Sequence, residues 1–84
     1  MYEVYLTKTA EKELRKIDKR YQTAIRNRLQ ELKSDPLIGK ALKDNLKDLR
    51  SLRIGVYRII YQIQKKELII YVIAIDHRQS AYKR

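Results

Sequence analysis

Hydrophobic and polar positions change their spacing along the chain, and each spacing predicts a different element. Residues 2–6 alternate between the two kinds of position, which predicts a short strand. After Thr7 or Thr9, either of which can cap a helix, apolar residues recur every three or four positions. This second spacing predicts a helix with one apolar side.

The helical spacing continues through two apolar stripes, with a break at Asp18 and Lys19 between them. The stripes consist of Ala10, Leu14, Ile17 and Tyr21, and then of Tyr21, Ile25, Leu29 and Leu32. Pro36 ends the second stripe, because proline cannot continue a helix. Two amphipathic helices, arranged as an antiparallel hairpin, are therefore expected after the first strand.

From residue 49 onward the spacing is that of strands, expected at 49–54, 56–64 and 68–76. In the middle strand one face carries Tyr57, Ile59, Tyr61 and Ile63, and the other carries Arg58, Ile60, Gln62 and Gln64. The start of the last strand, 68–75, is apolar on both faces, as in a strand that is covered on both sides.

The turns between these strands, near Gly55 and at Lys65 and Lys66, are too short for a crossover connection, which favours an antiparallel meander. Residues 37–48 give a weak signal and are expected to form a loop. The predicted fold is α+β, with an N-terminal strand, a two-helix antiparallel hairpin and a β meander that the hairpin covers on one side. We expect one domain, 1–84, with a single core.

Positive charge is concentrated in the second part of the chain. The net charge is +10, and residues 1–48 hold twelve Lys/Arg against eight Asp/Glu, whereas residues 49–84 hold eight against two. An excess of this size attracts polyanions such as nucleic acid, an anionic membrane surface or an acidic protein. Charge narrows the class of partner and leaves the chemistry open.

Several classes of protein are excluded by what the sequence lacks. The chain has no cysteine and a single histidine, so it offers neither disulfides nor a His/Cys ligand set for zinc, and no metal or cofactor is expected. Its longest apolar run, 68–75, has eight residues, far short of the ~17 to 25 that cross a bilayer as a helix. The first residues do not resemble a signal peptide. A soluble cytoplasmic protein is expected.

Cations with few acidic neighbours indicate a phosphate-handling site that works without a metal. Arg50, Arg53 and Arg58 lie on or beside the predicted strands, and Asp76-His77-Arg78 and Tyr82 follow the last one. A histidine that titrates near neutral pH is a candidate proton donor or acceptor. Catalysis and phosphate binding are the chemistry that this set of residues favours.

Each candidate also has a structural explanation. Arg58 could pair with a carboxylate across the sheet, and Arg50 and Arg53 could discourage aggregation at a sheet edge. His77 could be a solvated loop residue, and Tyr82 lies near the C-terminus, where side chains are usually frayed. The tyrosines at strand or helix spacing could stack on single-stranded nucleic acid, but we interpret them as core or rim residues: Tyr2, Tyr5, Tyr21, Tyr57, Tyr61 and Tyr71.

Two segments carry a family resemblance. Residues 52–61 read Leu-Arg-Ile-Gly-Val-Tyr-Arg-Ile-Ile-Tyr, and residues 77–82 read His-Arg-Gln-Ser-Ala-Tyr. Together with the order of strand, two helices and meander, they make the whole chain resemble the RelE/ParE superfamily of toxins from toxin-antitoxin systems. For the RelE branch, the resemblance implies a ribosome-dependent endoribonuclease that cleaves mRNA in the ribosomal A site by attack of the 2′-hydroxyl on the adjacent phosphorus.

The resemblance also implies roles for individual residues. Arg58 matches the strand arginine that contacts the scissile phosphate, Arg78 the arginine that stabilises charge or assists the leaving group, and Tyr82 the tyrosine that stacks on or orients a nucleotide. Relatives carry a lysine pair on the preceding strand, one lysine being the favoured general base, where this chain has Arg50 and Arg53. Since arginine is a poor base, a relay through the substrate phosphate, groups of the ribosomal RNA, or His77 would have to act as the base.

Two other functions are compatible with the sequence, and the resemblance also implies binding partners. A ParE-like toxin would have the same fold and would inhibit DNA gyrase without cleaving RNA, and a simple RNA-binding protein would bind RNA and leave it intact. The family implies a RelB-like antitoxin with an acidic binding segment, which would cover the basic groove or displace the segment that holds Tyr82. The expected partners are this antitoxin, in a higher-order hetero-oligomer, together with the ribosome and mRNA, and no membrane.

Overall fold

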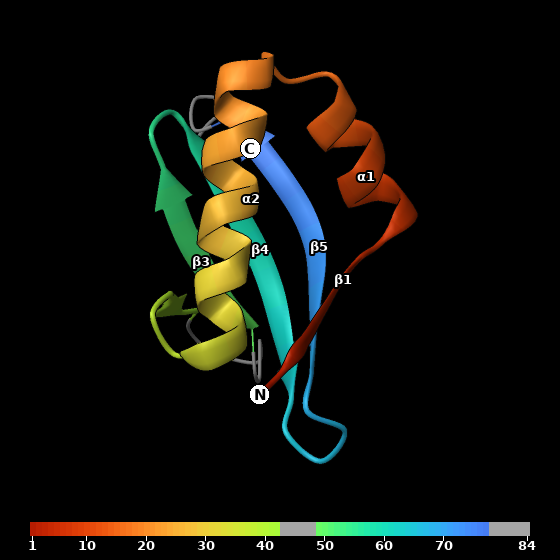
Figure 1. Ribbon diagram of the computed structural model, residues 1–84, viewed down its shortest axis with the longest axis vertical. Coiled ribbons are helices and arrows are strands. Elements are labelled where there is room, and N and C mark those ends of the chain that lie inside the picture. The colour runs from red at the N-terminus through yellow and green to blue at the C-terminus, as the bar shows by residue number, and fades with distance from the viewer. Residues whose placement is uncertain (43–48, 78–84) are drawn as a thin grey trace.

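The computed structural model describes residues 1–42 and 49–77, which form two helices on one side of a five-stranded sheet (Figure 1). The elements in chain order are β1 Glu3–Leu6, α1 Lys8–Arg15, α2 Lys19–Ser34, β2 Lys40–Ala41, β3 Leu49–Ile54, β4 Tyr57–Gln64 and β5 Ile69–His77. The strand order is β1-β5-β4-β3-β2, with β1 parallel to β5 and the other neighbours antiparallel. The predicted α+β fold is therefore confirmed.

Both helices begin at caps that the sequence provides. The Thr7 side chain accepts a hydrogen bond from the Ala10 N–H at 3.2 Å, and the Asp18 side chain accepts one from the Arg20 N–H at 2.9 Å. These side chains satisfy backbone donors that the first turn of a helix leaves without a partner. Because α1 ends at Arg15, Ile17 lies in the connection between the helices and not in the first helix, although it is still buried.

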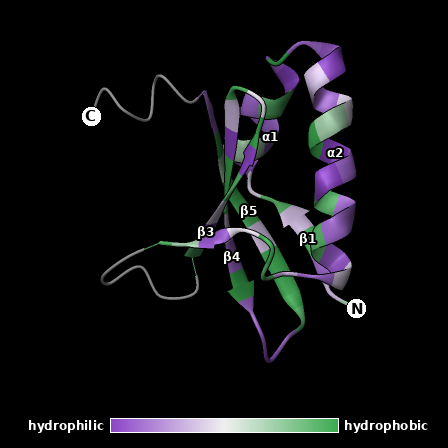
Figure 2. Ribbon diagram, turned by 90° about the vertical axis from the view of Figure 1, so that its left-hand side faces the viewer, coloured by the Kyte–Doolittle hydropathy of each residue, from purple (hydrophilic) through white to green (hydrophobic). Residues whose placement is uncertain are grey.

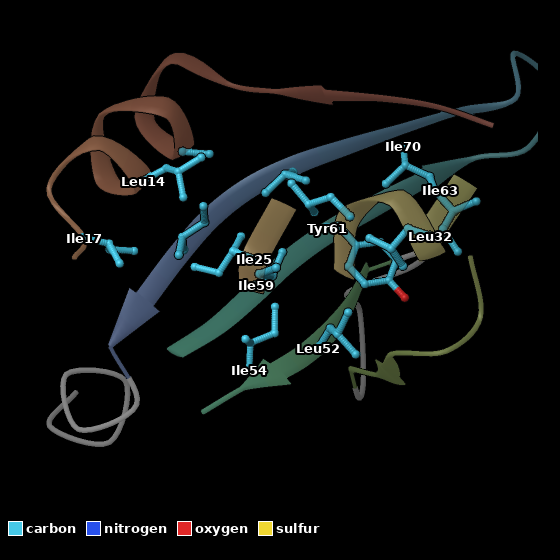
Figure 3. Close-up of a cluster of buried hydrophobic side chains, with 14 residues drawn as sticks. Leu14, Ile17, Ile25, Leu32, Leu52, Ile54, Ile59, Tyr61, Ile63 and Ile70 are labelled. Carbon is cyan, nitrogen blue, oxygen red and sulfur yellow. The ribbon is translucent and has the colours of Figure 1, made fainter. Parts of the chain in front are cut away.

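The core lies between the helices and one face of the sheet (Figure 3). The predicted face of β4 is confirmed, since Ile59, Tyr61 and Ile63 are buried and Tyr57 packs against the core. The helices and neighbouring strands contribute the other buried side chains, which are Ala10, Leu14, Ile17, Ile25, Leu29, Leu32, Leu52, Ile54, Ile70, Val72 and Ile75. No helix in residues 1–42 and 49–77 is long and apolar enough to cross a membrane.

The opposite face of the sheet, which we call the open face, has no described helix over it (Figure 2). In β5 Ile70, Val72 and Ile75 are buried, whereas Ile69 and Tyr71, which flank Ile70, are half-buried. The prediction that this strand is covered on both sides is therefore wrong for the described elements. The apolar residues on the outer side of β5 need another explanation.

The segment predicted as a loop, 37–48, contains one short strand within its described part. In β2, Lys40 pairs with Ser51 and Ala41 pairs with Arg50 of β3. Two residues are too few for a period to appear in the sequence, because this strand depends on its partner and not on a pattern of its own. Its formation brings Lys40 beside the meander.

Side chains near and in α1 complete the hydrogen bonding of β5 beyond the end of β1. The β1 pairing ends with Leu6 opposite Val72. Further along β5, the Thr7 hydroxyl donates to the Ile73 carbonyl at 3.0 Å, and the Ile75 N–H donates to the Glu13 carboxylate at 2.9 Å. The helix thus substitutes for the missing length of the edge strand, because buried backbone groups need partners.

Candidate functional site

A pocket of about 530 Å³ lies at the β2, β3 and β4 side of the sheet, and four of its residues are polar or charged. Lys40 pairs with Ser51, and Arg53 pairs with Arg58, so the four side chains occupy neighbouring positions on the open face. The other lining residues are Ile38, Ala41, Leu42 and Leu52. We refer to Lys40, Ser51, Arg53 and Arg58 as the cationic pocket.

The cationic pocket has no carboxylate partner among the described residues. The ion pairs of this part of the chain lie on or next to the helices and are Arg15–Glu11, Arg20–Asp18 and Arg28–Glu31. Asp76 is opposite Arg58 in the β4–β5 register, yet no ion pair joins them. Like charges directly opposite each other destabilise a sheet, so Arg53 beside Arg58 is an arrangement that an incoming anion would stabilise.

Arg58 is the most distinctive member of the pocket. Its Nε atom is buried and has no hydrogen-bond partner within the described structure. Leaving a buried donor without a partner costs about 1–3 kcal/mol, and more for a charged group. A guanidinium fits phosphate oxygens with parallel N–H donors. The sequence predicted this residue as a phosphate ligand or as a partner of a carboxylate, and the described residues form no such carboxylate pair.

Arg50 has backbone partners outside the pocket. Its Nη1 donates to the Gly39 carbonyl at 2.6 Å and makes a longer contact of 3.5 Å with the Leu37 carbonyl. In the β3–β4 register it is opposite Tyr61, which is completely buried on the helix side of the sheet. Arg50 is therefore placed to hold the turn before β2, and it is not among the residues that line the cationic pocket.

Tyr61 holds the same turn from the core. Its hydroxyl donates to the Pro36 carbonyl at 2.7 Å and accepts from the Gly39 N–H at 3.0 Å. A Cβ atom on Gly39 would lie 2.5 Å from the Tyr61 oxygen and 2.8 Å from the Ser51 carbonyl oxygen, so only glycine fits here. Burial raises the pKa of Tyr61. This closely fitted turn places Lys40 on the open face.

His77 lies on the other side of the sheet from Arg58. It pairs with Tyr57, and the two rings meet edge to face with centroids 5.4 Å apart. A β-bulge in β5 puts His77 on this side. Ile60 pairs with Ala74 but Tyr61 pairs with Val72, so the extra residue in β5 shifts the alternation of its side chains between the two faces by one position. His77 therefore faces the helix side.

The structure thus brings together some of the predicted site residues and separates others. Arg53 and Arg58 line one pocket, whereas Arg50 and His77 make their contacts elsewhere. The remaining two predicted residues, Arg78 and Tyr82, lie outside the described residues. No group of three or more metal-ligating side chains occurs within residues 1–42 and 49–77.

Lys40 is a pocket residue that sequence reasoning missed. It follows Gly39 in a segment with a weak pattern, and no motif marks it as functional. The signal that could have drawn attention to it is the short distance in sequence from Pro36 to Gly39, which is typical of a tight connection. Its place beside Arg53 and Arg58 comes from the pairing of β2 with β3.

Comparison with known proteins gives consistent matches over nearly the whole chain. Residues 4–82 match the model of a family described as the ParE toxin of the type II toxin-antitoxin system parDE. The chain is 33% identical over 85 residues to Toxin RelG of Mycobacterium tuberculosis, covering 99% of this chain and 98% of that protein.

Solved structures with the same fold include toxins both in complexes and alone. The toxin-antitoxin complex RelBE2 of M. tuberculosis contains a chain with a TM-score of 0.83 and 33% identity, and the match covers 92% of this chain and 98% of that one. The isolated RelE toxin of Escherichia coli has a TM-score of 0.82 and 22% identity, with 100% and 98% covered. The second likeness concerns the fold alone.

Proposed function

This chain belongs to the ParE toxin family, within the RelE/ParE superfamily of toxin-antitoxin systems, and we propose that it is a RelE-type endoribonuclease that cleaves mRNA in the ribosomal A site. The observation that carries this proposal is the pairing of Arg53 with Arg58 in a pocket without a carboxylate, with the Arg58 Nε buried and without a partner. A site of this kind suits a phosphodiester.

The proposed reaction uses the RNA's own nucleophile. The 2′-oxygen forms a bond to the adjacent phosphorus as its proton passes to a base, and the bond from phosphorus to the 5′-oxygen breaks as that oxygen takes a proton from an acid. The products are a 2′,3′-cyclic phosphate and a 5′-hydroxyl. Negative charge grows on the phosphoryl oxygens in the transition state, so fixed cations aimed at those oxygens accelerate the reaction.

Three cations of the pocket divide this work. Arg58 holds the scissile phosphate, and Arg53 and Lys40 add positive charge beside it. A neutral amine can accept a proton where a guanidinium cannot, so Lys40 in its neutral form is also the pocket's candidate base for the 2′-hydroxyl, and it becomes a cation as it takes that proton. We propose Arg78 and Tyr82 as the groups that assist the leaving oxygen and orient a nucleotide, by their match to the family. Arg50 supports the turn before β2, and His77 supports the end of β5.

The family also suggests how the toxin is controlled. Several similar chains of known structure belong to toxin-antitoxin complexes, among them the RelBE complexes of M. tuberculosis and E. coli. We propose that a RelB-type antitoxin with an acidic segment neutralises this toxin in a higher-order complex by covering the cationic pocket. Complementary charge across such an interface favours fast association. The toxin would act in the cytoplasm, where ribosomes translate mRNA.

The experiment that tests the function is to incubate the toxin with ribosomes programmed with a defined mRNA and to map the mRNA ends. We expect a cut within the A-site codon, a cyclic phosphate on the upstream fragment, and no cut in naked mRNA. The Arg58→Ala variant should lose the cut, whereas Lys66→Ala, in the turn between β4 and β5, should keep it. Intact mRNA with the wild-type toxin would contradict the proposal.

A second candidate is suggested by the name of the matching family. Its model describes ParE toxins, and a ParE-like toxin would inhibit DNA gyrase and leave RNA intact. Gyrase supercoiling, assayed in parallel with the same protein preparation, separates the two. We expect supercoiling to proceed unchanged; its inhibition together with intact mRNA would favour the second candidate.

A further inference from the structure

Two tyrosines form a pair on the open face, away from the cationic pocket. Tyr5 of β1 and Tyr71 of β5 are opposite each other in the parallel register, with ring centroids 6.1 Å apart and planes inclined by 34°. The residues on either side of Tyr71, Ile70 and Val72, are completely buried beneath the helices. Tyr71 and Tyr5 therefore face away from the core.

The sequence-based interpretation of this pair as core or rim residues is wrong. Neither Tyr5 nor Tyr71 belongs to the buried core or to the partly buried side chains packed against it, whereas Tyr2, Tyr21 and Tyr57 do. Tyr5 is 49% exposed. The alternation of β1 and β5 fixed which residues share a face, but not which face the helices would cover.

The pair adjoins groups that suit an RNA base. Gln62 of β4 is opposite Tyr71, and its amide, which can both donate and accept, has no hydrogen-bond partner among the described residues. Arg58 lies on the same face of β4, about 13 Å along the strand from Gln62 at ~3.3 Å per residue. An aromatic surface, a free amide and a cationic pocket thus follow one another across one face of the sheet.

We infer that Tyr5 and Tyr71 form a stacking platform for an unpaired base of the mRNA strand whose phosphate lies in the cationic pocket. This inference rests on the proposed function. The exposed face of a sheet is normally polar, and aromatic side chains on such a face stack bases in proteins that bind single-stranded RNA. The chain has a net charge of +10 and unpaired cations on the same face. These charges favour RNA, which is a polyanion, over a protein surface that has few acidic residues.

A purely structural role makes a different prediction. A cross-strand aromatic pair also stabilises the attachment of the edge strand β1. In that case, replacing a tyrosine would change stability, but removing a base from the RNA would have no effect on binding. An experiment that alters the RNA and leaves the protein unchanged therefore distinguishes base stacking from a purely structural role.

The test uses programmed ribosomes carrying mRNAs in which one nucleotide at a time, from the A-site codon onward, is abasic. The readout is the toxin concentration that gives half-maximal cleavage rate. We expect one abasic position outside the scissile pair to raise this concentration roughly 5- to 150-fold, the range typical of one stacked base. Unaltered values along the whole series would overturn the platform, and this arm requires no protein variant.

Protein variants test whether the tyrosines are the residues that stack on the base missing from the abasic mRNA. On intact mRNA, Tyr71→Leu should raise the half-maximal toxin concentration by the factor that the sensitive abasic position causes with the wild type. With Tyr71→Leu, making that position abasic should raise the concentration no further. Tyr71→Phe, which keeps the ring, and Tyr21→Leu, on the helix side, should respond as the wild type does. A Tyr71→Leu variant that keeps the full abasic response would overturn the platform, and thermal unfolding of each variant confirms that it is folded.

Failure of the platform is distinguishable from failure of the proposed function. If the wild type cleaves mRNA and Arg58→Ala does not, but the abasic series has no effect, the function stands and the platform is wrong. If the wild type leaves every mRNA intact, the proposed function fails and the platform fails with it.

Discussion

Tyr61 is the residue that determines where the cationic pocket begins. Its hydroxyl joins two backbone groups of the turn that follows α2, the Pro36 carbonyl and the Gly39 N–H. Figure 3 shows this oxygen at the outer end of a ring that is otherwise surrounded by apolar side chains. A core residue thereby orients the backbone that carries Lys40, so the geometry of the site depends on packing several residues away from it.

Replacing Tyr61 by phenylalanine should destabilise the protein by about 1–3 kcal/mol, because it leaves the Gly39 N–H and the Pro36 carbonyl without their partner. Equilibrium unfolding by urea measures this change. Tyr71→Phe is the matched control, since its hydroxyl has no hydrogen-bond partner among the described residues, and it should change the free energy of unfolding by less than ~0.5 kcal/mol. Equal losses in both variants would contradict the account.

The same comparison has a pH dependence with a definite sign. Burial raises the pKa of Tyr61 above its ordinary value of 10.0. The folded state therefore keeps its proton at a pH where the unfolded state has lost it, and stability falls as pH rises. Below pH 10 the difference in free energy of unfolding between wild type and Tyr61→Phe should be constant, and above pH 10 the advantage of the wild type should shrink.

Among the elements, β5 depends on α1 for part of its hydrogen bonding. Beyond the last residue paired with β1, the Ile75 N–H donates to the Glu13 carboxylate at 2.9 Å. This contact fixes the end of β5, which carries Asp76 and His77 to their opposite faces. The helix therefore supports the register of the strand beside Arg58.

The variant Glu13→Ala should lose about 1–3 kcal/mol of stability because the Ile75 N–H becomes a donor without a partner. Glu11→Ala provides the control on the same helix, since Glu11 forms only an exposed ion pair with Arg15 and such pairs contribute ~0–1 kcal/mol. Urea unfolding of both variants measures the difference. A loss in Glu13→Ala no larger than in Glu11→Ala would show that the contact contributes nothing.

The elements also explain what the sequence could predict. The strand at 49–54 and the alternating face of β4 were predicted correctly. In a long periodic segment, the spacing of the apolar residues itself shows which face is buried. The strand β2 has two residues and no period, and the bulge in β5 moves His77 to the helix side by a shift that the sequence does not mark. Both features arise from pairing with other strands, which a linear pattern does not contain.

For the site, the sequence predicted the arginines but not their relations. Arg53 and Arg58 lie opposite each other because a tight turn at Gly55 joins β3 to β4. Arg50 lies on the same strand as Arg53, but three positions away, which places it on the other face. Lys40 reaches the pocket through the pairing of β2 with β3 and the turn that Tyr61 holds.

At the scale of the whole molecule, the two faces of the sheet have different tasks. One face is covered by α1 and α2 and supplies the stability of the fold (Figure 1). The other face, free of described helices, carries the cationic pocket at the β2 side and the tyrosine pair at the β1 side. This division concentrates the chemistry that we propose on a single surface, which a strand of RNA or an antitoxin could cover.

The most direct measurement of the central claim is the single-turnover rate of mRNA cleavage at saturating toxin on programmed ribosomes, for wild type, Arg58→Ala and Arg20→Ala. Arg20 is an exposed arginine whose partner is Asp18 on the helix side, so it controls for the loss of one positive charge. We predict that Arg58→Ala lowers the rate constant roughly 100- to 1,000-fold, as expected when a group that stabilises transition-state charge is removed, and that Arg20→Ala leaves it unchanged. Cleavage by Arg58→Ala at the wild-type rate would contradict the account.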